Sequence, residues 1–200
     1  MKIGKRLRID TKSFFRKSPK KAKDEFGVFL ITGYQGTGKT YFGVYCLYNY
    51  FRDLKIKTNI HSLIIPKANI EYFDTIDSIV NDIEPNCIYL IDEISKKYTK
   101  ECKQDKLFYS WLQQSRKRKR YVYMITQEYL MIPTWLRGVS SVVFTTSKIP
   151  LTPLFKTYKG IPYLDEDTKE WGVRPVSTFI YKRNKFYTDM YDTFEPVSVL

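Results

Sequence analysis

The sequence of 200 residues predicts an α/β fold, a mostly parallel sheet covered by helices on both faces, followed by a small β-rich C-terminal extension. Three observations lead to this prediction. Near residue 30, an apolar stretch runs directly into a glycine-rich segment and then into a helix-like stretch. Strand-like and helix-like segments alternate as far as Thr145, an order that is typical of parallel sheets. Beyond Pro150 the pattern changes to short strand-like runs separated by turns.

The first segment, residues 1–24, is a basic N-terminal arm that precedes a core predicted at 25–150. Within residues 1–23, ten Lys and Arg stand against one acid, Asp10, so this stretch holds nine of the thirteen net positive charges. Such an arm attracts nucleic acid or anionic lipid in a salt-dependent way. It also fits a solubilising extension. Phe14 and Phe15 suit docking and membrane contact alike, so the alternatives stay open.

The core begins with a predicted buried strand, Val28 to Thr32, and a glycine-rich loop. Glycines permit backbone angles that a Cβ forbids, so consecutive N–H groups can surround an anion. The spacing Gly-x-x-x-x-Gly-Lys-Thr is the P-loop or Walker A pattern, in which Lys39 would reach the β- and γ-phosphates and Thr40 would bind Mg²⁺. The predicted nucleotide-binding residues are Gly33, Tyr34, Gln35, Gly36, Thr37, Gly38, Lys39 and Thr40.

Two helices and a strand are predicted after the loop. The stretch from Lys39 reads as a helix whose N-terminus would face the phosphates. Ile56 to Ile60 is a candidate strand. A second, amphipathic helix is predicted behind a cap at Asp74, and Pro85-Asn86 ends it. Its apolar face consists of Ile76, Ile79, Val80 and Ile83.

The next strand, Cys87 to Ile91, ends in two acids. The first carboxylate, Asp92, would hold Mg²⁺ together with Thr40, and the second, Glu93, would orient an attacking water molecule. That pair favours hydrolysis over phosphoryl transfer to another substrate. The alternative for Glu93 is an ordinary solvated loop acid.

A helix with an apolar face and another strand follow. The face consists of Leu107, Phe108, Trp111 and Leu112. The strand, Tyr121 to Thr126, ends at Gln127, whose amide would sense the γ-phosphate and position water, or would cap the following segment. The run RKRKR offers Arg116, Arg118 and Arg120 as an arginine finger for a neighbouring subunit, Arg116 being the first candidate. Its alternative is a basic helix end that complements the helix dipole.

The last core strand is Ser141 to Thr145, and the extension at 151–200 follows it. Turns are predicted at Lys159-Gly160 and at Arg183-Asn184. The runs VSTFIY and KFYTDMY around the second turn read as short antiparallel strands.

The composition narrows the class of protein. Three cysteines without paired spacing and one histidine argue against a disulfide framework and a zinc site, and favour a reducing compartment. The sequence has no apolar run of membrane-spanning length and no apolar signal-peptide segment at its start. We therefore expect a soluble, intracellular protein.

The stretch SWLQQSRKRKRYVYMITQEYLMIPTWLRGVSSVVFTT resembles the segment of FtsK/HerA superfamily ATPases that leads to their sensor strand. In that superfamily an arginine stands eleven residues before a strand-ending Thr/Ser-Gln, the separation of Arg116 and Gln127. The resemblance covers about residues 26 to 147. It implies a Walker A pair at Lys39 and Thr40, a Walker B acid at Asp92, a catalytic glutamate at Glu93 and a sensor at Gln127. ATP and Mg²⁺ are the implied cofactors.

Within this superfamily, a compact chain of this kind looks most like a viral genome-packaging ATPase. That resemblance implies a homo-oligomeric ring that moves DNA, with double-stranded DNA the expected cargo, into a preformed capsid through its portal vertex, in the cytoplasm of an infected host cell or on the virion. A close rival is the ATPase domain of zonula occludens toxin-like proteins, which act in filamentous phage assembly at the membrane and share a later Leu-Arg, here Leu136-Arg137. Those proteins usually carry a transmembrane helix. A small-molecule kinase is a third reading.

Overall fold

The computed structural model describes residues 26–192, so the basic arm and residues 193–200 lie outside the described residues. The sheet strands are β1 (Gly27–Thr32), β2 (Lys55–Thr58), β3 (Asn69–Tyr72), β4 (Cys87–Ile91), β5 (Tyr121–Thr126), β6 (Val142–Lys148), β7 (Leu154–Leu164) and β8 (Trp171–Lys182). The α-helices are α3 (Lys39–Cys46), α4 (Ile76–Ile79), α5 (Lys106–Gln113), α6 (Thr134–Val139) and α7 (Lys185–Thr188). A π-helix (Leu47–Phe51) continues α3, and 3₁₀ turns cover Ile94–Lys96 and Tyr129–Met131.

The strands form one sheet in the order β3-β2-β4-β5-β1-β6-β7-β8. All neighbours from β3 to β6 run parallel, and β7 and β8 are antiparallel additions. The predicted mostly parallel sheet is confirmed. Because β5 lies between β1 and β4, the residue that follows β5 comes between the P-loop and the acids that follow β4.

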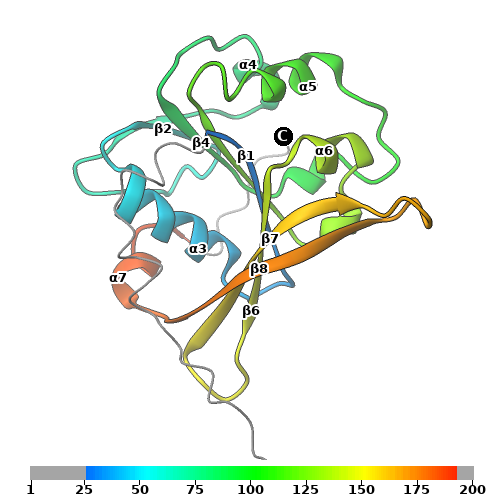
Figure 1. Cartoon of the computed structure of the whole chain (residues 1–200). Helices are drawn as coiled ribbons and strands as arrows, with labels where there is room; N and C mark the ends of the chain where they lie inside the picture. The colour runs from blue at the N-terminus through cyan, green and yellow to red at the C-terminus, as the bar shows by residue number, and fades with distance from the viewer. Residues whose placement is uncertain (1–25, 193–200) are drawn as a thin grey trace, which may run out of the picture.

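Helices cover both faces of the sheet, as predicted, and each face has its own apolar core (Figure 1). Neighbouring residues of one strand point to opposite faces, so Leu30 packs under α5 and α6 while Ile31 packs under α3. The central strands β1, β4 and β5 are buried along their whole length. This burial explains why they read as continuous apolar runs in the sequence.

Two predicted helix faces need correction. The helix α4 ends at Ile79, its cap is the Thr75 hydroxyl rather than Asp74, and Ile83 is exposed. Leu107 is exposed as well, although the rest of the predicted face of α5 is buried. The chain leaves the helix before Asp82 because this residue and Glu84 are held by contacts with distant side chains, which local periodicity does not register.

The C-terminal extension also differs from the prediction. Lys159 and Gly160 lie inside β7, where the register with β8 shifts, and the chain reverses only at residues 165–170. KFYTDMY is not a strand, because Asn184 caps the short helix α7. Tyr187 of α7 packs its ring against Tyr41 and Tyr45 of α3. The two long strands continue the main sheet through β6.

A buried charge network fixes the turn between α5 and β5. The Arg120 side chain is fully buried and donates from Nε to the Glu84 carbonyl at 2.7 Å and from Nη2 to the Asp82 carbonyl at 2.6 Å. Its guanidinium lies 5.4 Å from the centroid of the Trp111 ring. The Asp82 carboxylate in turn accepts from Lys57 and from Tyr89. Arg120 therefore has a structural role in this chain.

Replacing Arg120 with alanine is expected to lower the free energy of unfolding by about 3 to 5 kcal/mol, because it leaves a cavity and unpaired buried polar groups. Urea denaturation measures this loss. The matched control is Arg118→Ala, at a half-buried position in the same turn, for which we expect about 1 kcal/mol. Equal losses for the two variants would contradict the structural role of Arg120.

Candidate nucleotide site

The glycine-rich loop joins the end of β1 to the start of α3, as the sequence predicts. Gly36 and Gly38 have φ of +75° and +85°, angles that favour glycine. Among the described residues, the backbone N–H groups of Gly36, Gly38, Lys39 and Thr40 have no hydrogen-bond acceptor. Consecutive unpaired N–H groups at a helix N-terminus form a cradle for an anion.

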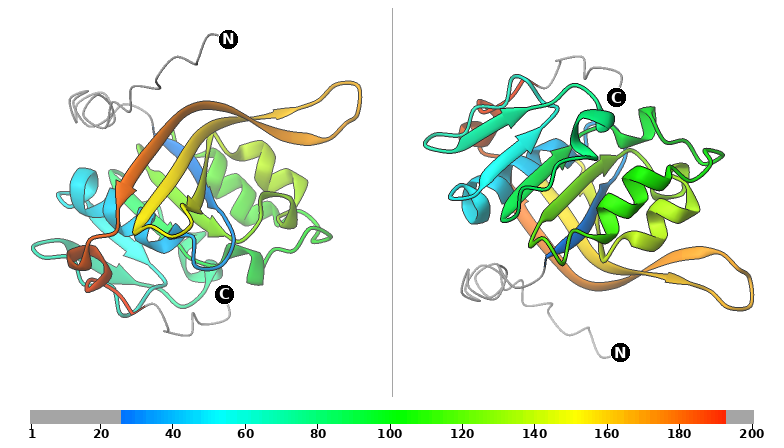
Figure 2. Two further views of the ribbon diagram at one scale, coloured as in Figure 1. Left: turned by 90° about the horizontal axis from the view of Figure 1, so that it is seen from below. Right: turned by 90° about the horizontal axis from the view of Figure 1, so that it is seen from above.

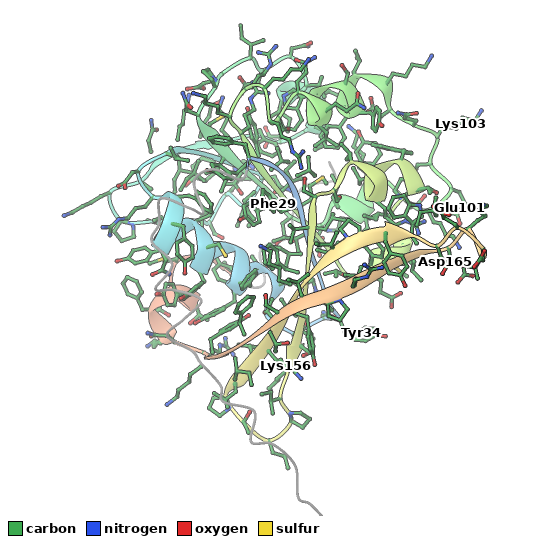
Figure 3. All side chains as sticks on the ribbon, viewed as in Figure 1. Phe29, Tyr34, Glu101, Lys103, Lys156 and Asp165 are labelled. Atoms are coloured by element: carbon green, nitrogen blue, oxygen red, sulfur yellow. The ribbon has the colours of Figure 1, made fainter. Side chains whose placement is uncertain are left out.

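Close packing makes glycine necessary at both ends of the loop. A Cβ at Gly33 would lie 2.4 Å from the Thr146 carbonyl oxygen, and one at Gly38 would lie 3.0 Å from the ring of Phe155. Thr146 belongs to β6 and Phe155 to β7, so the extension buttresses the loop from behind. Tyr34 and Gln35 lie at the exposed side of the loop, where Figure 3 labels Tyr34. The Thr37 hydroxyl donates to the Tyr34 carbonyl at 2.7 Å.

The predicted magnesium ligands are in contact although they stand 52 residues apart. The Thr40 hydroxyl donates to Oδ2 of Asp92 at 2.9 Å. Asn59, which follows β2, brackets the same acid, because its side chain donates to the Asp92 carbonyl at 3.0 Å and accepts from the Asp92 N–H at 2.8 Å. Burial raises the pKa of Asp92, and the Thr40 hydrogen bond opposes that rise.

Lys39 and Glu93 complete the charged part of the site. Lys39 donates from Nζ to the Tyr34 carbonyl at 3.0 Å. Burial lowers the pKa of Lys39, while the nearby carboxylates of Asp92 and Glu93 oppose this shift. Glu93 has φ of +53°, a left-handed conformation that is strained for a residue with a side chain and that recurs at functional sites. Its carboxylate forms an ion pair with Lys96.

Gln127 follows β5 and lies between the loop and the acids. Its carbonyl accepts from the Gly33 N–H at 3.0 Å, which ties it to the P-loop. Its exposed side chain lines a hollow of about 530 Å³, together with Ser95 and Leu130 among others. This position suits both the predicted sensing of a phosphate and the predicted placing of water.

Arg116 lies at the other end of the sheet. It is exposed, its Nη2 donates to the Ser141 hydroxyl at 3.1 Å, and its side chain passes Gly27 at the start of β1. The six residues of β1 separate it from the P-loop by about 20 Å. The structure therefore brings Lys39, Asp92, Glu93 and Gln127 together and leaves Arg116 outside this group.

The residues present fit a magnesium nucleotide. The unpaired N–H groups and Lys39 would hold its phosphates, and the Thr40 and Asp92 oxygens would hold the metal ion, for which hydroxyl and carboxylate ligands are well suited. Sequence analysis did not find Asn59, Thr146 and Phe155. Asn59 had a signal, since it is a polar residue near the end of a predicted strand, whereas Phe155 had none.

Several other predictions concern the described residues. Cys46, Cys87 and Cys102 form no disulfide. In the described part of the chain, no helix is both long enough and apolar enough to cross a membrane. Leu136 and Arg137 are buried in α6, and burial lowers the pKa of Arg137, whose guanidinium lies 5.8 Å from the ring centroid of Tyr129.

The chain is similar in structure to several solved proteins. The N-terminal domain of zonular occludens toxin from Neisseria meningitidis matches with a TM-score of 0.58 and 18% identity, over 83% of this chain and 98% of that one. The genome packaging NTPase B204 of Sulfolobus turreted icosahedral virus 2, in complex with ATP-gammaS, matches with a TM-score of 0.50 and 10% identity, over 74% and 96%. A third solved structure, an ATPase domain, matches with a TM-score of 0.52 and 11% identity, over 84% and 85%.

No protein-family model and no curated protein sequence matches this chain. At these low identities the structural matches establish the fold. It is the fold of P-loop NTPases.

Proposed function

We propose that the chain is a magnesium-dependent ATPase that moves DNA as a homo-oligomeric ring and packages a viral genome into a preformed capsid. The observation that carries the hydrolytic part is the contact between Thr40 and Asp92, with Lys39 and Glu93 beside it. A P-loop followed by such an acid pair is the arrangement of nucleotide hydrolases.

Each residue of the site has a role in this proposal. The α3 N-terminus and Lys39 bind and orient the phosphates, and Thr40 with Asp92 holds Mg²⁺, which offsets phosphate charge. Glu93 orients a water molecule and accepts its proton, and the Gln127 amide helps to place that water. Asn59 keeps Asp92 in position through its two hydrogen bonds. A small-molecule kinase has no use for a water-activating glutamate.

The ring is supported by the place of Arg116. An exposed arginine about 20 Å from the P-loop of its own chain is too far away to touch that nucleotide. It can serve only a site in another copy. DNA as the cargo is supported by the net charge of +13, much of which lies in the basic arm at 1–24, outside the described residues.

A zonula occludens toxin-like role in phage assembly at the membrane is the alternative. It is favoured by the TM-score of 0.58 to that protein's N-terminal domain, which the match covers almost completely. In that role the basic arm would bind anionic lipid instead of DNA. Both functions use the same hydrolytic site.

One assay separates the two functions. We expect duplex DNA to raise the ATP turnover of the full chain several-fold in low salt and less in high salt, because DNA binding through phosphates weakens with added salt. Stimulation by vesicles with anionic lipid, but not by DNA, would favour the assembly role. Lys39→Ala is the control, since it removes nucleotide binding and should show no turnover with either partner.

A further inference from the structure

The outer part of the β7–β8 hairpin stands apart from the rest of the sheet. β6 pairs with β7 only as far as Gly160, and beyond it β7 pairs with β8 alone. We call residues 161–174 the ribbon. In both views of Figure 2 the ribbon projects beyond the body of the molecule. An isolated two-stranded ribbon is marginal in water, so a protruding one gains stability from a partner surface.

The two faces of the ribbon differ. On the inner face, Trp171 lies beside Gly138 of α6 and Val173 packs against the core. On the outer face, Ile161 and Tyr163 are 51% and 40% exposed. Only the outer face is therefore available to another molecule.

The outer face is held in one shape. The Tyr163 ring lies so close over Gly172 that a Cβ there would be 2.7 Å from it, and the Arg174 guanidinium is 5.6 Å from the centroid of the same ring. Tyr and Arg on a rigid support are the residue types that dominate binding energy at protein interfaces.

The tip of the ribbon has the opposite charge to the chain as a whole. Its acids are Asp165, Glu166, Asp167 and Glu170, with Lys169 as the one cation among residues 164–171, in a chain of net charge +13. Asp165 shapes the tip, because its carboxylate accepts from the N–H groups of Asp167 and Thr168. Figure 3 labels Asp165 at the far end of the hairpin. The side chains of Glu166 and Asp167 have no ion-pair partner among residues 26–192.

A surface of complementary charge exists on the same chain. We call residues 116–119, Arg-Lys-Arg-Lys, the basic turn; its four residues carry four positive charges, and Lys117 and Lys119 are exposed. Within one copy the described residues show no ion pair between the tip and the basic turn. The acidic tip of one copy and the basic turn of another are therefore free to meet, and such complementarity selects partners.

We propose that the ribbon docks on a second copy of this chain, with its acidic tip against that copy's basic turn and with Ile161 and Tyr163 buried in the contact. A contact between two different patches of identical chains is head-to-tail, and it closes into a ring when its rotation permits. The proposal rests on the proposed function only for the ring. It places the tip beside Arg116, so the docked ribbon would also position that arginine for the neighbouring nucleotide.

Charge reversal in two variants tests the contact by sedimentation equilibrium of the full chain without nucleotide or DNA. Glu166→Lys with Asp167→Lys keeps Asp165, and Lys117→Glu with Lys119→Glu keeps Arg116. Each double variant is expected to lower the self-association constant about 10- to 100-fold in low salt. An equimolar mixture of the two should regain much of the association, because opposite charges then meet again. Asp53→Lys with Asp74→Lys, two exposed acids elsewhere, is the matched control and should associate like the original chain.

A variant on the apolar face gives an independent test. Ile161→Ser should weaken association about 10-fold with little dependence on salt, because it removes buried apolar area and no charge. Circular dichroism confirms that each variant is folded. A monomeric original chain at its highest soluble concentration would overturn the proposal, and so would tip variants that associate normally or mixtures that show no recovery. Loss of ATP turnover with intact association would count against the proposed function alone.

Discussion

Replacing Arg116 with alanine is expected to lower ATP turnover in the assembled protein by about 10³- to 10⁵-fold while nucleotide affinity stays nearly unchanged. The reason is geometric. Arg116 bonds to Ser141 at the start of β6, about 20 Å from the P-loop of its own chain, so its contribution is to charge that develops on a neighbour's nucleotide. Steady-state turnover and fluorescent-nucleotide titration measure the two quantities. Arg52→Ala, an exposed arginine elsewhere, is the control.

Mixing defective copies tests whether Arg116 acts between subunits. Chains that lack Arg116 and chains that lack Glu93 are each inactive alone, yet a mixed ring contains interfaces where an intact Glu93 meets an intact Arg116. Partial recovery of turnover is expected, and even a small recovery stands clear of so low a background. If mixed rings form and remain inactive, the role in trans is wrong. Arg118 is then the next candidate, because the buried Arg120 cannot leave its network without a large loss of stability.

Replacing Glu93 with glutamine is expected to lower turnover by about 10²- to 10⁴-fold and to leave ATP binding intact. The amide has nearly the shape of the carboxylate but cannot accept a proton from water. It also gives up the ion pair with Lys96, so a measurement of thermal unfolding should accompany the kinetics. Asp53→Asn, the same chemical change at an exposed acid, is the control.

The contrast with Lys39→Ala makes the Glu93 experiment decisive. Lys39 is expected to act in binding, so its loss should raise the dissociation constant of ATP, whereas the Glu93 variant should trap bound ATP. Normal hydrolysis by the Glu93→Gln protein would remove this residue from the catalytic site and would revive the reading of an ordinary loop acid.

The two central strands and the P-loop were predictable because their causes are local. Cys87–Ile91 and Tyr121–Thr126 have the predicted bounds, since strands that are buried on both faces must be apolar without interruption and are followed at once by polar residues. Gly33, Gly36 and Gly38 could be assigned because the motif itself demands their backbone freedom. Asp92, Glu93 and Gln127 were found because each ends such a strand.

Local pattern failed where distant contacts decide the conformation. KFYTDMY alternates like a strand, but the Asn184 cap and the packing of Tyr187 on α3 make it helical. The helix α4 is short because Asp82 is held by Lys57 and Tyr89.

The sequence by itself determined the phosphate cradle, the acid pair and the strands that carry them, because backbone freedom, burial and strand ends are written in neighbouring residues. Only the tertiary structure decided that β5 lies between β1 and β4, that Asn59 brackets Asp92, and that Phe155 supports Gly38. It also decided that Arg116 lies far from its own P-loop while Arg120 is buried. These outcomes depend on which strands become neighbours, and that choice is made by packing between residues that are distant in the chain.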